Sequence, residues 1–442
     1  MIRYVSAWSV FFALSLFSGP ASADRLLALH GDAGLGAIGS TAQAALELGF
    51  DVREGGLALG LAGRVRLALG EADGQAGPLR RRDFDEVSDY LHILRYFDYA
   101  RQIGSVSLHV AAGEIRGDTL GHGTLLRDFS NIADPDHLHA GARITLHHDV
   151  FDLSLLLDNL ARPTLLGGRF ALRPIAKLRA LSFGVSGVMD VRAPTQGRFA
   201  NDGRPAVDAA TWTPDVDTRA LGFASADVAL WLHRGRKEIT PYVDVATSFQ
   251  GIGLHAGATG KLPLGGSGLT LGLQVEYRLT SGAYAPDYFG TFYDIERYQA
   301  SLAFSERHRL ISGAQTKLHA LDAGLFGGHG VLAQVSLDAG RKVQAKVGYR
   351  YHPGPDGSQL WVRVVTEPTT RLTLGALAVV RALGQASQGA DGLATLAEAR
   401  YRITPYLYAL AQFARSWALS EETRTYAPLL RFNVGVGGTF SR

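Results

Sequence analysis

Apolar and polar residues alternate along most of the chain with a period of two. In GLTLGLQVEYRLT, residues 268–280, apolar side chains occupy every second position from Leu269 to Leu279, and Gln274, Glu276 and Arg278 lie between them. Because successive side chains of a β-strand point to opposite faces, this stretch has one apolar and one polar face. The alternation recurs in segments 42–51, 57–69, 106–110, 181–190, 331–338 and 343–350.

Turn signals separate these segments. Gly327-Gly328, the triplet at 338–340 and the Pro- and Gly-rich stretch at 353–357 are typical of short hairpin connections. Counting runs of roughly 9 to 11 residues, the length that a tilted membrane strand needs, predicts about 18 antiparallel strands, in a range of about 16–20. No shift in composition marks a second domain. We therefore expect an all-β protein, an up-and-down transmembrane β-barrel formed by residues 24–442.

Four connections are longer than the others: residues 71–86, 116–136, 191–217 and 281–296. Outer-membrane barrels have short turns at one end and long loops at the other, and four long loops among short turns fit that asymmetry. Aromatic residues gather near segment ends, where an aromatic girdle at the lipid headgroups or ordinary sheet packing would explain them. They are Tyr284, Tyr288, Phe289, Phe292, Tyr293, Tyr298, Tyr349, Tyr351, Tyr406, Tyr408 and Trp417.

The first 23 residues have the order of a secretory signal peptide. Arg3 precedes an apolar run from about Ala7 to Phe17, and small residues follow up to Ala23. The run falls short of the roughly 20 residues that a spanning helix needs, which favours a signal peptide over the alternative of a membrane anchor, and no later run is long and apolar enough for a transmembrane helix. The chain has no cysteine, so disulfides and thiolate metal sites are excluded, and its formal net charge of +3 argues against a nucleic-acid partner. The 53 glycines suit turns and a close-packed lumen.

The last segment is the most specific. Leu430, Phe432, Val434, Val436 and Phe440 alternate with polar or small residues, and the sequence ends two residues after Phe440. This resembles the closing strand of Gram-negative outer-membrane β-barrels, whose final aromatic residue is recognised by the assembly machinery. The pattern departs from that signal because Ser441 and Arg442 follow the aromatic residue. The resemblance implies a porin-like architecture and identifies no particular family.

Strand parity selects candidate pore-lining residues. If the apolar faces meet lipid, the polar residues between them point into the lumen, because a Lys or Arg on the lipid face costs about 2–4 kcal/mol near the midplane. The alternative is that these residues pair across strands and close the lumen. The candidates are Arg64, Arg66, Gln274, Glu276, Arg278, Lys342, Lys346, Arg350 and Arg431.

The stretch LGHGTLLRDFSN, residues 120–131, is the most distinctive segment outside the expected strands. We predict either a loop folded into the lumen, with His122, Arg127 and Asp128 at a constriction, or a hydrogen-bonded turn that seals one mouth. A histidine and carboxylate cluster follows, but solvated loop histidines are commoner than metal sites, and we expect no metal or other cofactor. The cluster comprises Asp134, Asp136, His137, His139, His147, His148 and Asp149.

We therefore expect a porin-like outer-membrane channel for passive or facilitated passage of small polar solutes, with mild tolerance of anions. Ser186 lies in GVSGV, which is not a nucleophile elbow, so an enzyme is not expected. The alternatives are a closed barrel acting as an enzyme on lipid or peptide, a surface receptor or structural anchor, and a secreted soluble all-β protein. Expected partners are outer-membrane lipid, lipopolysaccharide and the barrel-assembly machinery; the sequence leaves monomer and oligomer open.

Overall fold

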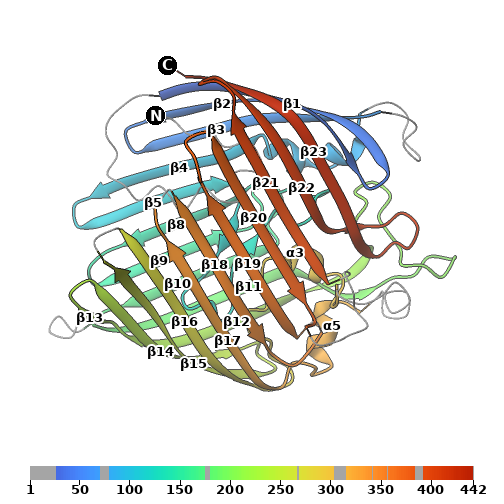
Figure 1. The fold of residues 1–442 in the computed structure, drawn as a ribbon. Coiled ribbons are helices and arrows are strands. Elements are labelled where there is room, and N and C mark those ends of the chain that lie inside the picture. The colour runs from blue at the N-terminus through green and yellow to red at the C-terminus, as the bar shows by residue number, and fades with distance from the viewer. Residues whose placement is uncertain are drawn as a thin grey trace.

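The computed structural model describes residues 26–69, 79–174, 180–265, 268–302, 315–340, 342–355, 357–383 and 392–441. The predicted signal peptide, residues 1–23, lies outside these residues. Antiparallel strands form one continuous wall around a central lumen (Figure 1). Within the described ranges, no helix has the length and apolar character needed to cross a membrane.

The wall and the connections are formed by different elements. The wall strands are β1 (Leu26–Ile38), β2 (Thr41–Glu54), β3 (Leu57–Ala68), β4 (Leu94–Ile103), β5 (Val106–Gly113), β8 (Gly141–His147), β9 (Phe151–Leu157), β10 (Leu165–Leu172), β11 (Leu181–Gly197), β12 (Val216–Leu230), β13 (Leu232–Arg234), β14 (Lys237–Thr247), β15 (Ile252–Leu264), β16 (Leu269–Thr280), β17 (Gly328–Asp338), β18 (Val343–Tyr351), β19 (Ser358–Thr366), β20 (Leu372–Arg381), β21 (Leu393–Arg402), β22 (Leu407–Leu419) and β23 (Tyr426–Ser441). The connections contain η2 (Arg81–Asp83), α2 (Val87–Leu91), β6 (Arg116–Asp118), β7 (Phe129–Ser130), α3 (Tyr293–Glu296) and α5 (Lys317–Asp322).

The sheet closes on itself. Each wall strand pairs with the next along the chain, except that β12 and β13 both pair with β14, and β1 pairs with β2 on one side and with β23 on the other. The last pairing runs from Ala28 opposite Ser441 to Ile38 opposite Arg431, so the C-terminal segment is the closing strand that its alternation predicted. Closure leaves the sheet without an edge that could pair with another chain.

The number of strands differs from the prediction. The wall sheet has 21 strands, of which β13 continues β12 along β14, so the barrel has twenty strands in the described part of the chain. We predicted about 18, and twenty is the upper end of the range. The count was low because β8 and β9 have 7 residues each and β10 has 8, fewer than the run length used for counting.

The apolar face of each strand points outward. On β16, Val275 is 58% exposed and Tyr277 48%, whereas Glu276 between them is 4% exposed and Arg278 is fully buried. The same parity exposes Val331 and Val335 on β17 and Val434 and Val436 on β23. The outer wall is thus a continuous apolar surface, and the polar face of the alternating pattern looks into the barrel.

The described parts of the long connections lie together at one end of the barrel. Leu26 and Ser441 lie at the other end, where short turns such as 55–56, 104–105 and 235–236 join the strands (Figure 1). The long connections are 69–93, 114–140, 198–215 and 281–327. The predicted loop at 191–217 is shorter than expected, because β11 continues to Gly197 and β12 begins at Val216.

Two of these connections fold into the barrel. We call residues 114–140 together with the described parts of 281–327 the inner plug; their backbones meet where Leu126 pairs with Phe289 in parallel. The plug has its own apolar core, in which Phe289 and Leu126 are fully buried. Lumen-facing Phe223 of β12 stacks on this core, with its ring 4.9 Å from that of Tyr288.

The plug corrects the girdle interpretation for most aromatic residues at 284–293. Tyr284, Tyr288, Phe289, Phe292 and Tyr293 are 0–6% exposed inside the barrel, not at the headgroups. The alternation of apolar and polar residues could not predict this inward position, because a loop lacks the two-residue period that distinguishes the two faces of a strand. Tyr408 and Trp417 are also buried, whereas Tyr349, Tyr351 and Tyr406 are exposed near strand ends.

Candidate functional site: the lumen and its inner plug

Two glycines allow the backbone turns of the loop at 119–128. Gly121 and Gly123 have φ angles of +58° and +83°, in the left-handed region that favours glycine. A Cβ at Gly123 would lie 2.5 Å from the Arg127 guanidinium, so the missing side chain also lets Arg127 fold back across the loop. Arg127 there donates to the His122 carbonyl and, at 3.1 Å, to Gln274 Oε1 on β16.

Polar contacts with lumen-facing strand residues hold this loop against the wall. The His122 ring stacks on Tyr242 with 3.8 Å between ring centroids, and its Nε2 lies 3.2 Å from Asp227 Oδ1. Thr124 Oγ1 donates to Asp244 Oδ2 at 2.6 Å. The loop predicted as a candidate constriction therefore lies inside the lumen, attached to β12, β14 and β16.

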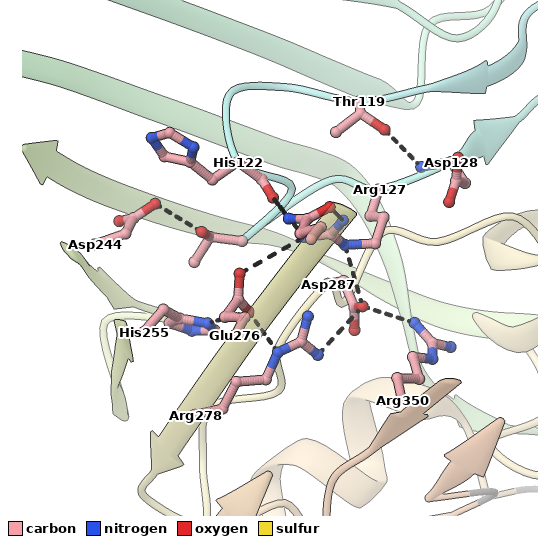
Figure 2. Close-up of polar contacts among 12 residues, drawn as sticks. Thr119, His122, Arg127, Asp128, Asp244, His255, Glu276, Arg278, Asp287 and Arg350 are labelled. Carbon is pink, nitrogen blue, oxygen red and sulfur yellow. Dashed lines mark hydrogen bonds and ion pairs between the residues drawn. The ribbon is translucent and has the colours of Figure 1, made fainter. Parts of the chain in front are cut away.

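Asp287 is the charged centre of the plug (Figure 2). Three arginines surround its Oδ2: Arg350 Nη1 of β18 lies 2.9 Å away, Arg278 Nη1 of β16 3.3 Å and Arg127 Nε 3.7 Å. Burial alone would raise the pKa of Asp287, but Arg350 and Arg278 hold it well below its usual range. One carboxylate thus joins both plug segments to two wall strands.

A second charged contact ties the plug to β20, two strands along the wall from β18. Glu296 of α3 lies 2.5 Å from Lys317 Nζ of α5 and accepts from Arg381 of β20. Lys317 Nζ also donates to the Tyr288 carbonyl at 2.6 Å. Although burial opposes its charge, Arg381 and Lys317 hold the pKa of Glu296 well below its usual range. All three side chains are buried, so both helices of the plug are fixed through ion pairs.

The plug leaves open space along one side of the lumen. A cavity open to solvent, about 770 Å³ with that solvent included, lies between the plug and β18, β19 and β20, and its lining includes Arg116, Arg127, Asp128, Phe292, Lys346, Arg350, Gln359, Trp361, Arg363, Leu377, Val379 and Arg381. A second open cavity, about 730 Å³ on the same measure, lies against β1–β3 and β21–β23, lined among others by Asp32, Glu47, Arg64, Arg66, Leu396, Leu410, Arg431 and Asn433. Both cavities lie on the side of the lumen formed by β18–β23 and β1–β3.

The residues selected by parity fall into three groups. Arg64, Arg66 and Arg431 line the second cavity, and Lys346 and Arg350 line the first. Gln274, Glu276 and Arg278 lie buried under the plug, where Glu276 is 2.5 Å from Arg278 and 3.0 Å from His255. Lys342 lies in the exposed turn before β18, because that strand begins only at Val343.

Of the loop candidates, Arg127 and Asp128 line the first cavity, and Asp128 Oδ1 lies 3.0 Å from Lys346 Nζ. His122 faces β12 and β14 as described. Arg363 and Arg381 were not among the predicted residues, although both lie in alternating strands and parity could have found them. Asp287, Glu296 and Lys317 were not predicted either, because no periodic pattern marks them.

The histidine and carboxylate cluster does not assemble as one group. Among the described residues, no set of three or more His, Asp or Glu side chains is placed to hold a metal ion. His137 Nδ1 lies 3.1 Å from Asp134 Oδ2, and its Nε2 lies 2.9 Å from the Thr211 carbonyl, which joins the plug to the connection at 198–215. His147 pairs with Asp152 at the other end of the barrel.

The His137 contacts predict a stability that depends on pH. Burial opposes the charge, but Asp134 and the Thr211 carbonyl raise the pKa of His137 from 6.5 to about 10. A raised pKa stabilises the fold fully below the unfolded value and loses this contribution as pH rises through about 10. We expect wild type to melt well above His137→Gln at pH 6, with the gap shrinking as pH rises from 6.5 to about 10; His147→Gln is the control. A gap independent of pH contradicts this role.

The closed antiparallel wall with an apolar outer surface and a charged interior defines the class of protein. In lipid, backbone hydrogen bonds must be satisfied internally, and a closed barrel does this. An outward apolar face with a polar lumen is the arrangement of transmembrane barrels of the outer-membrane type. The chain is an outer-membrane β-barrel, as its sequence predicted.

Comparisons with known proteins give no family. No protein-family model matches the chain, and no curated protein sequence is similar to it. Similar solved structures include OpdL of Pseudomonas aeruginosa, at 12% identity and a TM-score of 0.37 over 95% of this chain and 99% of that one. OpdK of the same species, solved with vanillate, is 10% identical, with a TM-score of 0.36 over 95% of this chain and 99% of that one. OccAB2 of Acinetobacter baumannii is 9% identical, with a TM-score of 0.34 over 94% of this chain and 98% of that one.

Proposed function

We propose that the protein is a porin-like channel that passes small polar solutes and prefers anions. The charge of the cavity linings carries this proposal. The linings of the two cavities hold nine cations against three carboxylates, those of Asp32, Glu47 and Asp128. Three of the cations are also paired with carboxylates behind the lining, Arg127 and Arg350 with Asp287 and Arg381 with Glu296. The nine cations are Arg64, Arg66, Arg116, Arg127, Lys346, Arg350, Arg363, Arg381 and Arg431. Basic groups lining a narrow pore lower the electrostatic barrier for anions and raise it for cations.

The width of the barrel supports a water-filled path. Barrels of about 16–18 strands leave an aqueous channel, and this wall has more strands than that. The inner plug takes up part of the lumen, so solutes would pass beside it, along β1–β3 and β18–β23, where both cavities lie. The fixed plug sets the pore width, and its charged surface selects the solute.

The first cavity also has the chemistry to hold an organic anion. Phe292, Trp361, Leu377 and Val379 form an apolar part of a lining whose charged residues are all basic except Asp128. Trp361 Nε1 and Gln359 Oε1 are buried without a hydrogen-bond partner in the part of the chain that the structure describes. A solute with a carboxylate, an apolar body and a polar substituent would match the cations, the aromatic surface and these two groups.

Reversal potentials across a planar bilayer test the anion preference. Under a salt gradient of potassium chloride we expect a potential of the sign given by faster chloride permeation, and a smaller potential for Arg363→Gln, which removes a cation from the first cavity. Arg219→Gln is the control, because Arg219 pairs with Asp322 in the exposed region outside both cavities. A potential of the opposite sign in the wild type contradicts the proposal.

The second candidate function is a closed barrel that acts as an enzyme, receptor or anchor. The ion-paired plug is the observation that favours it, because Asp287 and Glu296 both fix plug segments across the lumen. A closed barrel predicts a correctly folded protein that gives no conductance steps in a bilayer. The same recordings therefore separate the two functions.

A further inference from the structure

The hairpin between β12–β13 and β14 ends in three basic residues. It lies at the end of the barrel where Leu26 and Ser441 also lie (Figure 1). Arg234 and Lys237 are directly opposite each other across the two strands, and Gly235 and Arg236 form the turn between them. All three basic side chains are exposed. Short turns of transmembrane barrels face the periplasm, so this hairpin points to the periplasmic leaflet.

On the outer face of this hairpin, apolar side chains give way abruptly to basic ones. Val228 lies opposite Val243, and these residues are 44% and 49% exposed. Leu232 lies opposite Ile239, both 48% exposed. The next outward-facing pair is that of Arg234 and Lys237, two residues further along each strand, or about 7 Å at the usual rise.

The end of the apolar rows sets the level of Arg234 and Lys237. Leu232 and Ile239 are the last outward-facing apolar pair before the turn, so the two cations that follow them lie where the hydrocarbon gives way to the headgroups.

The two opposed cations have no partner of opposite charge in the described residues. Like charges directly opposite on neighbouring strands destabilise a sheet, and a folded protein would reduce that cost with a carboxylate nearby. Glu238 cannot serve, because it lies on the other face of β14, opposite His233 on β13 and Lys261 on β15. An external anion between Arg234 and Lys237 would relieve the repulsion.

We propose that Arg234 and Lys237 bind the headgroup phosphate of an anionic phospholipid in the periplasmic leaflet, with Arg236 beside it. A guanidinium matches two phosphate oxygens, and an ammonium supplies a point charge. The acyl chains of the same lipid would lie along the rows of Leu232 and Ile239 and of Val228 and Val243. The cations directly continue the lipid-facing rows of the same hairpin, which favours a lipid headgroup over a soluble acidic protein.

Lipid binding to the purified protein in detergent tests this site, by native mass spectrometry with phosphatidylglycerol or phosphatidylcholine added. We expect wild type to prefer phosphatidylglycerol, and the double variant Arg234→Ser/Lys237→Ser to lose roughly tenfold or more of that affinity. Arg204→Ser/Arg219→Ser is the matched control, because it removes two exposed arginines at the other end. Unchanged heat-modifiable gel mobility shows that each variant folds.

Three results would overturn the proposal. The first is equal binding of both lipids by wild type, and the second is unchanged phosphatidylglycerol affinity in the double variant. The third comes from two competitors, lipid A and an acidic peptide. If either one binds through Arg234 and Lys237 while phosphatidylglycerol does not, the partner is lipopolysaccharide or a protein instead. The test uses no channel recordings, so its result is independent of the proposed channel function.

Discussion

Asp287→Asn should increase the single-channel conductance and destabilise the protein. The variant removes the carboxylate that Arg127, Arg278 and Arg350 share, and leaves three guanidinium groups close together. Breaking one partner of a buried ion pair typically costs about 3–5 kcal/mol. Repulsion among the arginines would release the plug from β16 and β18, so the pore widens. Conductance in planar bilayers and the urea midpoint of unfolding measure the two effects.

The control for this variant is Asp322→Asn. Asp322 lies 2.6 Å from Arg219 Nη2, but this pair is exposed, and exposed pairs contribute about 0–1 kcal/mol. We expect its conductance and stability to stay close to those of the wild type. If Asp287→Asn also behaves as the wild type does, the plug is held in place by its apolar core and not by the Asp287 ion pairs.

Val335→Lys should prevent stable insertion, whereas Gln334→Lys in the neighbouring position should not. Val335 is 47% exposed on the outer face of β17, and Gln334 points into the barrel next to Gln274. A Lys on the lipid face costs about 2–4 kcal/mol near the bilayer midplane, whereas a lumen position leaves the charge among polar groups. Gel mobility of heated and unheated samples gives the folded fraction, and urea titration in vesicles gives the free energy of unfolding.

The two substitutions introduce the same side chain one residue apart, so only the face differs. Equal loss of folding in both variants, or a larger loss for Gln334→Lys, would show that the apolar face of β17 does not meet lipid. The comparison therefore tests the orientation of the wall independently of channel activity.

The wall was predictable from the sequence because a strand has a strict period of two. Val275 and Glu276 were assigned to opposite faces from their order alone, and the structure separates them in this way. The strand count was low because hairpins such as β8–β9 are shorter than a usual membrane strand. Short strands show too few alternations to stand out from a loop.

The interior was predictable only in part. Parity selected Arg64, Arg350 and Arg431, which line the cavities, but it could not tell these from Arg278, which the plug covers completely. The difference depends on a loop that lies far away in the sequence. Asp287 comes from such a loop, and its three arginines come from two strands and another loop. No local sequence pattern predicts that these four side chains come into contact.

Several expectations from the sequence stay predictions. The signal peptide lies outside the described residues, and recognition of β23 by the assembly machinery stays a prediction. Binding of lipopolysaccharide and the oligomeric state are likewise untested. The outward position of Phe440, which is 62% exposed, leaves its ring accessible on the closing strand.

The most direct test of the central claim is the current through purified protein inserted in a planar lipid bilayer. We predict discrete conductance steps in potassium chloride, because water-filled space remains between the plug and β18–β20. The reversal potential should show preference for chloride, as the nine cations lining the cavities require. A protein that is folded by its gel mobility and inserts without conducting would contradict the channel, and a preference for potassium would contradict its charge selectivity.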